Sequence, residues 1–508
     1  MRHARESGSA SVKRARARIV AIDQGTTGTT VLVLDERAVV LGRGYAELPQ
    51  HFPKPGWVEH RGEEIWATTL QALAVALSAA GPGAPDAIGI TNQRETALLW
   101  DRRTSNPAAP AIVWQDRRTA DRCASLRRAG REPVIRRTTG LRLDPYFSAT
   151  KVEWMLRADL ALRARARRGE IAFGNVDSWL VWKLTGGAVH ATDPTNASRT
   201  LLYDIRRQRW DPGLCALFGV PESTLPEVRP SAGDFGATRR VPGIPDGVPI
   251  RGIAGDQQAA LFGQGCVRRG GLKNTYGTGC FLMLHTGGRP MFSRSGLLTT
   301  IACGPRGEPA YALEGSVFIG GAAVQWLRDG LGLIERSTDV ESLAASVEDS
   351  GGTVLVPAFA GLGAPYWRAD ARGVWSGITR GTTRAHLARA VLESIAFQTR
   401  DVSVAMEKDA RARVRGLRVD GGAAADDLLM QMQADLLGVP IVRPAMLEST
   451  ALGAALLAGI GAGIWSRRED VPVTAEGERT FRPKIGARQR KERVAAWDRA
   501  VRMLLRTP

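Results

Sequence analysis

The feature that most constrains the fold of this chain is a short pattern that occurs twice. Residues 19–35 form a β-branched run, a turn of glycine and threonine, and a second β-branched run, which is typical of a β-hairpin. Residues 273–284 repeat the pattern, with a glycine–threonine turn at 277–279 before an apolar run. Two similar hairpins in the two halves of a 508-residue chain predict an internal duplication with a ligand between the halves.

The segments around the hairpins alternate between strand-like and helix-like patterns. Residues 66–80 place apolar side chains along one helix face and end at Gly-Pro-Gly, and residues 87–91 then read as a buried strand. A single helix is expected over 151–168. Residues 417–420 predict a strand that enters a glycine turn before a helix over 426–437. This alternation in both halves predicts an α/β fold.

The net charge of +18 is concentrated at the two ends of the chain. The first 18 residues carry six Lys or Arg and one Glu, and residues 481–508 carry nine Lys or Arg against two acidic residues. Basic ends are more often solvated tails than nucleic-acid surfaces. We therefore expect a near-neutral body with no nucleic-acid partner.

Cysteine usage and hydropathy favour a cytoplasmic protein. The five cysteines contain no CxxC pair and the six histidines no HExxH pair, so neither a disulfide framework nor a zinc site is expected. The longest apolar run, 450–465, is shorter than the about 20 residues of a membrane span, so no membrane insertion is expected. The Arg-rich first 18 residues could mimic a transit peptide, but a disordered extension is the favoured interpretation.

Two common nucleotide motifs are absent, which leaves the hairpins as phosphate-binding candidates. No lysine is followed by Ser or Thr, so there is no Walker A loop, and no GxGxxG occurs. Backbone N–H groups in tight glycine turns and threonine hydroxyls can both donate to phosphate oxygens. Asp23, at the end of its strand, could hold Mg²⁺ through water. For either hairpin alone, a plain β-turn is the alternative.

Several ordered motifs resemble the FGGY carbohydrate kinases, in particular the members that phosphorylate glycerol. They lie at residues 23–27, 53–60, 92–96, 144–147, 252–259, 276–281, 373–378, 386–393, 420–422 and 481–483. The resemblance covers the chain from about residue 19 to its end. It implies Mg-ATP-dependent phosphorylation of glycerol to sn-glycerol 3-phosphate with release of ADP.

The resemblance also implies a domain organisation. Two duplicated ribonuclease-H-like domains of the actin/hexokinase type are expected over 19–264, for glycerol and phosphate binding, and over 265–470, for nucleotide binding. The active site would lie in the cleft between them. A basic extension over 1–18, expected to be disordered, and a basic tail with a helix over 471–508 flank these domains. Family members are commonly homo-oligomers, so a dimer or tetramer is expected.

Asp256 is the candidate catalytic base. Phosphoryl transfer to an alcohol needs a base within reach of the acceptor hydroxyl, and Asp256 follows an apolar run that ends at Gly255. The family resemblance points to the same residue. A helix N-cap before residues 257–262 is the alternative interpretation of this aspartate, and both roles could hold.

A small triol needs hydrogen-bond donors, acceptors and an apolar wall. Arg94 supplies donors and Glu95 an acceptor just past a buried strand end, where open α/β sheets bind ligands. The alternatives are a surface Arg–Glu ion pair and a core role for Phe281. By resemblance, the glycerol-binding residues are Arg94, Glu95, Trp114, Tyr146, Asp256, Gln257 and Phe281.

The resemblance also implies a nucleotide-binding set, which is Thr26, Thr27, Gly28, Gly277, Thr278, Gly321, Gln325, Gly422 and Asp426. Asp23 is the metal candidate from its place at the end of its strand. Close helix packing at Gly321 and a surface position for Gln325 are the alternatives.

The chain departs from the family pattern at four places. Residues 28–30 are Gly-Thr-Thr where Ser-Ser-Arg is usual, and Asp426 replaces an asparagine near the adenine. The loop that binds fructose 1,6-bisphosphate in some bacterial members is not visible around 233–247, and the phosphorylatable histidine of another group is absent.

Two rival functions stay open at this stage. The first is a kinase of the same family that acts on another small polyol or sugar. The second, of a different class, is a non-catalytic protein that binds nucleotides or nucleic acid.

Overall fold

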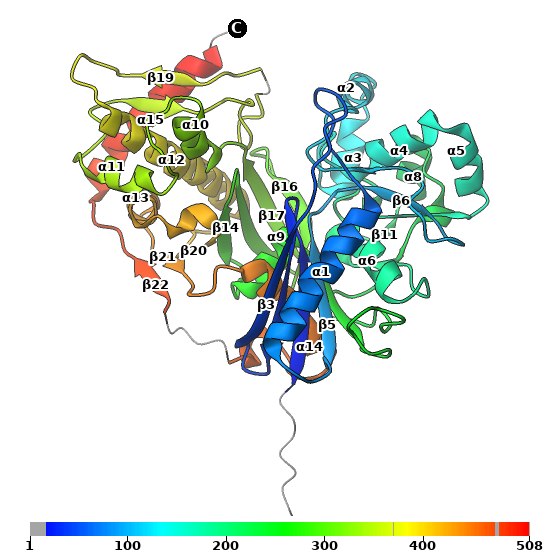
Figure 1. The fold of residues 1–508 in the computed structure, drawn as a ribbon. Coiled ribbons are helices and arrows are strands. Elements are labelled where there is room, and N and C mark those ends of the chain that lie inside the picture. The colour runs from blue at the N-terminus through cyan, green and yellow to red at the C-terminus, as the bar shows by residue number, and fades with distance from the viewer. Residues whose placement is uncertain (1–16, 369, 473–476, 507–508) are drawn as a thin grey trace, which may run out of the picture.

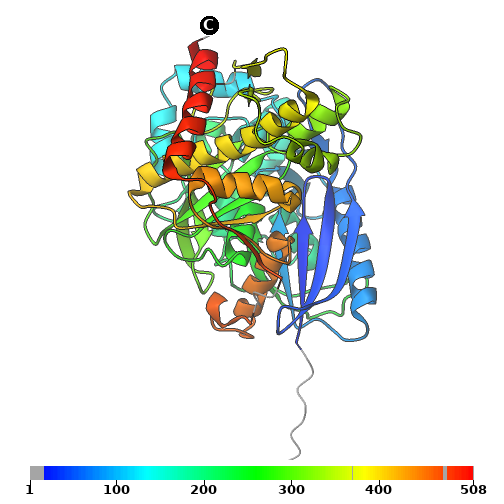
Figure 2. The same cartoon turned by 90° about the vertical axis from the view of Figure 1, so that its left-hand side faces the viewer.

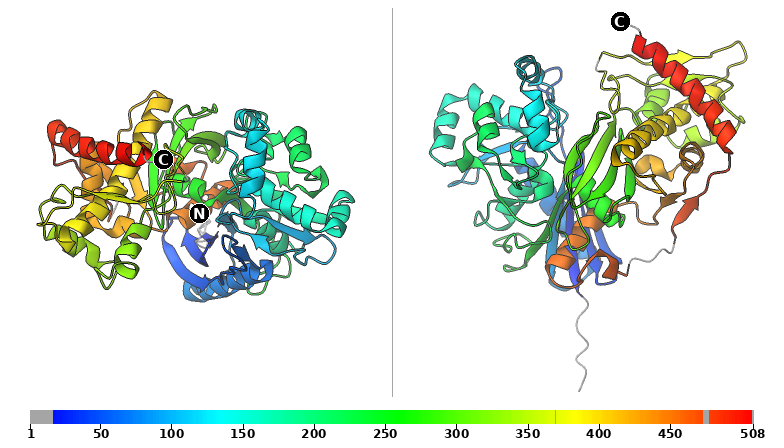
Figure 3. Two further views of the ribbon diagram at one scale, coloured as in Figure 1. Left: turned by 90° about the horizontal axis from the view of Figure 1, so that it is seen from above. Right: turned by 180° about the vertical axis from the view of Figure 1, so that it is seen from behind.

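The computed structural model describes residues 17–368, 370–472 and 477–506, so most of the expected extension over 1–18 lies outside it. The chain forms two lobes that meet at a common base, as Figure 1 shows from the front and Figure 3 from above and from behind. Each lobe is built around one β-sheet. None of the helices in this described part combines the length and the hydropathy needed to cross a bilayer.

The sheet of the first lobe has the order β13-β5-β1-β2-β3. Its strands are β1 (Arg18–Gln24), β2 (Gly28–Asp35), β3 (Val40–Glu47), β5 (Ala87–Asn92) and β13 (Ile250–Gly255). Strand β1 runs antiparallel to β2 and parallel to β5, which is itself parallel to β13. The predicted hairpin is therefore confirmed, and its turn is closed by a hydrogen bond from Gly25 N–H to Gly28 O.

The sheet of the second lobe has the order β16-β17-β15-β14-β20-β21-β22. Its strands are β14 (Leu272–Tyr276), β15 (Cys280–Gly287), β16 (Leu298–Cys303), β17 (Pro309–Val317), β20 (Leu417–Asp420), β21 (Ile441–Arg443) and β22 (Arg479–Phe481). Strand β14 runs antiparallel to β15 and parallel to β20, as β1 does to β2 and β5. The shared topology confirms the predicted α/β fold and its internal duplication.

Helices cover both sheets, with long helices in equivalent positions. Helix α1 (Gly62–Ala80) connects β3 to β5 through the segment around β4 (Glu59–His60) and packs on β2 and β3. In the second lobe, α12 (Arg384–Ala410) precedes β20 and packs on β15 and β17. Figure 2 shows α12 beside the carboxyl-terminal helix α15 (Ala487–Arg506), whose Trp497 ring stacks on Phe397.

The outer part of the first lobe is inserted between β5 and β13. It contains β6 (Leu98–Asp101), β7 (Ala111–Ile112), α2 (Ala120–Arg128), α3 (Glu132–Thr139), α4 (Ser148–Ala158), α5 (Leu160–Arg167), β8 (Ile171–Gly174), α6 (Val176–Leu184), β9 (Ala191–Thr192), α7 (Pro194–Ala197), β10 (Tyr203–Asp204), β11 (Arg209–Trp210), α8 (Pro212–Phe218) and β12 (Glu227–Val228). The single helix expected over 151–168 is wrong. Asp159 is extended there, and its side chain accepts a hydrogen bond from Leu162 N–H at 2.9 Å, which begins a second helix.

The remaining elements belong to the second lobe and its connection to the first. They are α9 (Asp256–Gly263), α10 (Ala322–Asp329), α11 (Asp339–Ala345), β18 (Val354–Val356), β19 (Val374–Ser376), α13 (Asp427–Leu437) and α14 (Ser449–Gly461).

Helices α9 and α14 join the two lobes at their base. Helix α9 follows the last strand of the first sheet but also contacts β14, β15 and β16 of the second. Helix α14 follows β21 of the second sheet but packs on β1, β5 and β13 of the first. Most of the apolar run 450–465, too short for a membrane span, therefore belongs to the buried helix α14, which ends at Gly461.

Glycine allows the backbones of these two helices to touch. A Cβ atom on Gly453 of α14 would lie 1.9 Å from the carbonyl oxygen of Ala259 in α9. Because the obstacle is backbone, no side-chain rotation can relieve the overlap. The spacing of the two helices, and with it the spacing of the lobes, depends on this residue.

We predict that Gly453→Ala destabilises the protein by at least about 2 kcal/mol, because overpacking against backbone forces the helices apart. Helix propensity alone would make the alanine variant more stable by about 1 kcal/mol. A lower free energy of unfolding would therefore have to come from the packing clash. Urea unfolding checks this. Gly288→Ala is the matched control, since a Cβ there meets nothing within 4 Å. Equal stability of the two variants would contradict the prediction.

Candidate functional site

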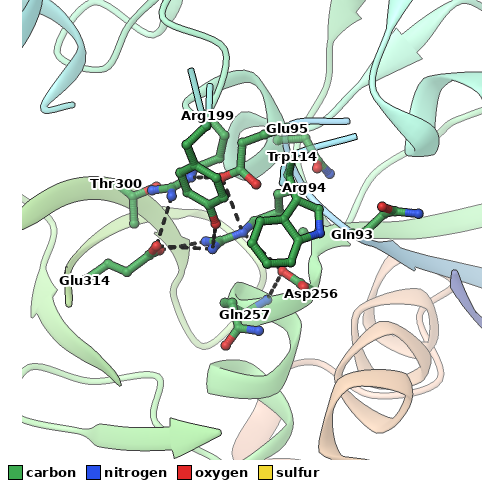
Figure 4. A network of polar contacts seen from close by, with 12 residues as sticks. Gln93, Arg94, Glu95, Trp114, Arg199, Asp256, Gln257, Thr300 and Glu314 are labelled. Carbon is green, nitrogen blue, oxygen red and sulfur yellow. Dashed lines mark hydrogen bonds and ion pairs between the residues drawn. The ribbon is translucent and has the colours of Figure 1, made fainter. Parts of the chain in front are cut away.

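Polar side chains from both lobes meet beyond the carboxyl ends of β5 and β13. Figure 4 shows Arg94, Glu95 and Asp256 of the first lobe together with Glu314 of the second. Arg94 and Glu95 follow β5 directly and are only 2% and 1% exposed. The alternative of a surface ion pair is therefore wrong.

Hydrogen bonds hold both Nη atoms of Arg94, while its Nε, buried without a hydrogen-bond partner among the described residues, forms an ion pair with Asp256. Its Nη1 donates to Glu314 Oε2 at 2.6 Å and to Gln258 Oε1 at 3.1 Å, and its Nη2 donates to Glu314 Oε1 at 3.1 Å. Nη2 also donates to the Tyr146 hydroxyl at 3.3 Å, and Nε lies 3.1 Å from Asp256 Oδ1. Burial lowers the pKa of Arg94, but Glu314, Glu95, Tyr146 and Asp256 together outweigh this effect and hold the pKa well above its usual value.

A second buried arginine completes the network and was missed by the sequence analysis. Arg199 donates from Nε to Glu95 Oε1 at 2.6 Å and from Nη2 to Glu314 Oε1 at 2.9 Å. Burial raises the pKa of Glu314, yet Arg199 and Arg94 together hold that pKa at about 2. The sequence carried one signal for Glu314, a carboxylate inside an otherwise apolar strand, because such a group must be paired when buried.

The backbone at Glu95 is strained. Its φ is 64°, a left-handed value that is uncommon for a residue with a side chain, and Thr96 N–H donates back to Arg94 O at 2.8 Å. Such strain persists where the surrounding contacts fix it and is common at functional sites. Here the tight turn lets Arg94 and Glu95, although adjacent in sequence, both reach the buried network.

Asp256 is the one acidic residue of the network that faces the space between the lobes, with a side chain 30% exposed. Its Oδ1 accepts from Gln257 N–H at 2.6 Å and lies beside Arg94 Nε. Its Oδ2 makes no hydrogen bond to any residue that the structure describes, so one carboxylate oxygen is available. The N-cap of α9 is Gly255 rather than Asp256, so the capping interpretation of Asp256 is wrong.

Three of the predicted residues form an aromatic wall. The ring centroid of Trp114 lies 5.6 Å from that of Tyr146 and 6.4 Å from that of Phe281, in edge-to-face arrangements. Phe281 is only partly buried, so it is not simply a core residue. The indole N–H of Trp114 donates to Thr26 Oγ1 at 2.9 Å, which ties this wall to the first hairpin.

The first hairpin places its predicted residues in different environments. The hydroxyl of Thr26 accepts the hydrogen bond from Trp114, whereas the side chain of Thr27 is exposed. Gly28 packs under Tyr45, whose hydroxyl would lie 2.5 Å from an added Cβ.

Asp23 is the second-last residue of β1, just before the turn of this hairpin. Burial, together with smaller effects of the Asp256 and Glu448 charges, raises the pKa of its carboxyl group to about 7. In the described ranges there is no cluster of three or more His, Cys, Asp or Glu residues suited to a metal. A metal held at Asp23 would therefore keep most of its ligands as water or substrate oxygens.

The second hairpin lies against two glycine-containing segments. Gly321 N–H donates to Gly277 O at 2.9 Å, and Ala322 N–H donates to Thr278 O at 3.1 Å, which brings the start of α10 onto the hairpin. Gln325 is exposed one turn along α10, and a Cβ on Gly422 would meet nothing within 4 Å.

Asp426 has a structural role that the sequence analysis did not assign. It is the N-cap of α13, and its Oδ1 accepts from Leu429 N–H at 2.8 Å. Its other oxygen, Oδ2, is buried without a hydrogen-bond partner among the described residues. Burial, with smaller effects from Glu341 and Asp427, raises the pKa of Asp426 to about 6.

Comparison with known proteins gives matches over nearly the whole chain. Residues 18–263 match the N-terminal domain, and residues 272–462 the C-terminal domain, of the FGGY family of carbohydrate kinases. The chain is 58% identical to the glycerol kinase of Aromatoleum aromaticum and 55% identical to that of Myxococcus xanthus, in each case over 95% of this chain and 98% of the relative. The crystal structure of Plasmodium falciparum glycerol kinase with ADP is similar with a TM-score of 0.91 at 35% identity, covering 97% of this chain and 99% of that one.

We predict that Arg199→Met destabilises the protein by about 3–5 kcal/mol, because Glu95 and Glu314 lose a partner while remaining buried. Chemical unfolding at pH 7 measures this. Arg209→Met, at an exposed position of β11, is the control and should change stability by less than about 0.5 kcal/mol. A loss as small as that of the control would show that the network tolerates the missing charge.

We also predict a pH effect for Asp23→Asn in the absence of Mg²⁺ and nucleotide. The usual pKa of aspartate is 3.8, and the pKa of Asp23 in the folded protein is about 7. Between these two pH values the folded carboxyl group holds a proton that the unfolded chain has released. The stability that Asp23 contributes relative to asparagine should therefore be present below pH 4 and be lost as the pH rises through 7. Unfolding free energies of both proteins between pH 4 and 8 test this, and parallel profiles would contradict it.

Proposed function

Because the chain belongs to the FGGY family of carbohydrate kinases, we propose that it transfers the γ-phosphoryl group of ATP to glycerol, giving sn-glycerol 3-phosphate and ADP. The observation that carries the choice of acceptor is the identity of more than half of all aligned residues to glycerol kinases over nearly the full chain. The geometry of the site supports it, since a compact set of donors and acceptors faces an aromatic wall.

Glycerol would bind between the network and the wall. Its hydroxyls need both donors and acceptors, which Arg94, Asp256 and Gln257 supply, while Glu95 and Tyr146 complete the polar side. Trp114 and Phe281 would cover its carbon atoms. A larger sugar would require more room between these rings and the arginine.

Asp256 is the proposed catalytic base. Oδ1 is fixed by Arg94 and by the Gln257 backbone, so the free Oδ2 can accept the proton of the attacking hydroxyl. The transferred group would be bound by the two hairpins, with Thr27 exposed on the first and Thr278 exposed on the second. Positioning and charge stabilisation are the main tasks of the protein in such a transfer.

Asp23 is the proposed site for Mg²⁺, and its chemistry fits that ion. Carboxylate oxygen suits a hard cation that keeps several water ligands and binds through one or two carboxylates. Burial is the main cause of the raised pKa of Asp23, and the smaller contributions of Asp256 and Glu448 come from negative charges that a divalent cation would offset. When bound, Mg²⁺ would screen the phosphate oxygens.

The nucleotide would extend from the second hairpin past Gly321, Gln325 and Gly422 to Asp426. The unpartnered Oδ2 of Asp426 can accept a hydrogen bond from the adenine amino group. This acceptor explains how an aspartate can replace the usual asparagine, because the capping bond uses only Oδ1.

Further expectations complete the proposal. Residues 19–264 and 265–470 would be the two domains, and the tail from 471 would pack on the second through α15. A cytoplasmic homo-oligomer, dimer or tetramer, without a nucleic-acid partner is proposed on the family resemblance, and light scattering of the purified protein would measure its mass.

The test of the function is ADP release from Mg-ATP with glycerol and a panel of C3–C6 polyols and sugars. We expect saturable turnover, with glycerol as the best acceptor. Preference for a larger polyol would contradict the choice of glycerol as the acceptor but not the proposed mechanism. Absence of turnover together with salt-sensitive binding to nucleic acid would favour a non-catalytic protein.

We predict that Asp256→Asn lowers kcat by about 10²–10⁴-fold, because the amide cannot accept the hydroxyl proton. The fold should be retained, since asparagine preserves the shape of the side chain. Asp246→Asn, at an exposed loop position, is the control and should leave kcat unchanged. A wild-type kcat for Asp256→Asn would remove this residue from the role of base.

A further inference from the structure

Lys273 is a fully buried lysine at the boundary between the lobes, and no step above uses it. It lies on β14, the first strand of the second sheet, and has no exposed surface. Burying an ammonium group costs several kcal/mol unless it is well paired. An apolar residue would satisfy a purely structural position at lower cost, so the contacts of this lysine need another explanation.

The ammonium group of Lys273 contacts one residue of the first lobe and one of its own strand. It donates a short hydrogen bond to the side-chain oxygen of Gln257, the second residue of α9. It also donates to Thr275 Oγ1 at 2.7 Å. The lysine thus connects the second sheet to the helix that carries Asp256.

The charges around Lys273 keep it a cation at neutral pH. Burial lowers its pKa to about 8, against the opposing effects of Asp420 and Asp256. A protonated lysine has three donors and no acceptor. Only the oxygen of the Gln257 amide can therefore face it, which fixes the orientation of an amide whose two ends are otherwise nearly equivalent in shape.

Fixing the oxygen of Gln257 determines what the other end of the amide presents. Within the described parts of the chain, the Nε2 group of Gln257 makes no hydrogen bond. Asp256, the neighbouring residue, presents the free acceptor Oδ2. The start of α9 therefore offers one acceptor and one donor side by side.

We propose that Lys273 is a positioning residue for the acceptor substrate: it holds the Gln257 amide so that Nε2 donates to a substrate hydroxyl. A hydroxyl that accepts from Gln257 keeps its own proton free for a carboxylate, which suits a polyol lined by Asp256 and Glu95. This inference rests on the proposed function. It assigns to Lys273 an effect on acceptor binding through Gln257, and none on the nucleotide.

A double-mutant cycle with Lys273→Met and Gln257→Met tests this role. We expect each single variant to raise the KM for glycerol about 10-fold or more, the usual effect of losing an oriented hydrogen bond. The KM for ATP should change less than about 2-fold. The double variant should be no worse than Gln257→Met alone, because both substitutions remove the same interaction.

Other outcomes of the cycle would overturn the proposal. Additive effects on the KM for glycerol would mean that Lys273 acts independently of Gln257. A rise in the KM for ATP equal to that for glycerol, or a lower kcat with both KM values unchanged, would indicate a general structural or nucleotide-related role.

A conservative variant keeps the proposal testable if Lys273→Met fails to fold. Gln257→Glu retains an acceptor for Lys273 and the size of the side chain but replaces the Nε2 donor with oxygen. It should fold and should raise the KM for glycerol about as much as Gln257→Met. A wild-type KM for glycerol in Gln257→Glu would refute the donor role of Gln257 and with it the role of Lys273.

Calorimetric titration of the wild-type protein and the variants with glycerol separates this inference from the proposed function. If the wild type prefers another polyol, the same cycle is measured with that polyol, and coupling between Lys273 and Gln257 is still expected. If turnover fails but glycerol binds, the Kd values give the coupling directly. If the wild type binds no polyol, both the proposed function and the role of Lys273 are contradicted, whereas glycerol turnover with additive variants contradicts the latter alone.

Discussion

The arrangement of the site depends on the ion pair between Arg94 and Glu314, which joins the two lobes. Glu314 lies within a strand of the second sheet and binds Arg94 and Arg199 of the first lobe. Every charge in this group is buried, so the network is stable only when complete. With its guanidinium fixed by Glu314, Arg94 can hold one oxygen of Asp256 and leave the other free.

The packing of the two helices that join the lobes fixes the distance over which this ion pair forms. Helices α9 and α14 each pack on the sheet of the other lobe, and the contact between Gly453 and Ala259 lets their backbones meet. Asp256 begins one of these helices. The packing of the interior and the geometry of the candidate base are thus set by the same element.

Buried polar groups in this protein act in pairs that orient one another. Lys273 fixes the oxygen of Gln257, and Arg94 fixes one oxygen of Asp256. Asp426 uses one oxygen to cap α13 and keeps the other unpaired. In each case a structural contact occupies one end of a side chain and leaves the opposite end without a partner among the described residues.

The sequence by itself determined the features that arise from local geometry. Glycine–threonine turns between β-branched runs indicated both hairpins, and the position of Arg94 and Glu95 after a buried strand predicted a ligand site at that strand end. The family resemblance supplied the remaining site residues. Local patterns can be recognised in this way because turns and strand ends depend on neighbouring residues.

Only the tertiary structure decided the partners of these residues. Arg94 and Glu314 are 220 positions apart, and they meet because two sheets of the same topology pack through exchanged helices. Arg199, Glu314 and Lys273 lack a local motif, so their roles depend on long-range pairing. The break at Asp159 and the cap at Asp426, by contrast, come from local hydrogen bonds, in which each aspartate accepts from the N–H three residues along the chain. Burial makes the long-range pairings of Arg94, Arg199, Glu314 and Lys273 obligatory, and burial is a property of the folded chain as a whole.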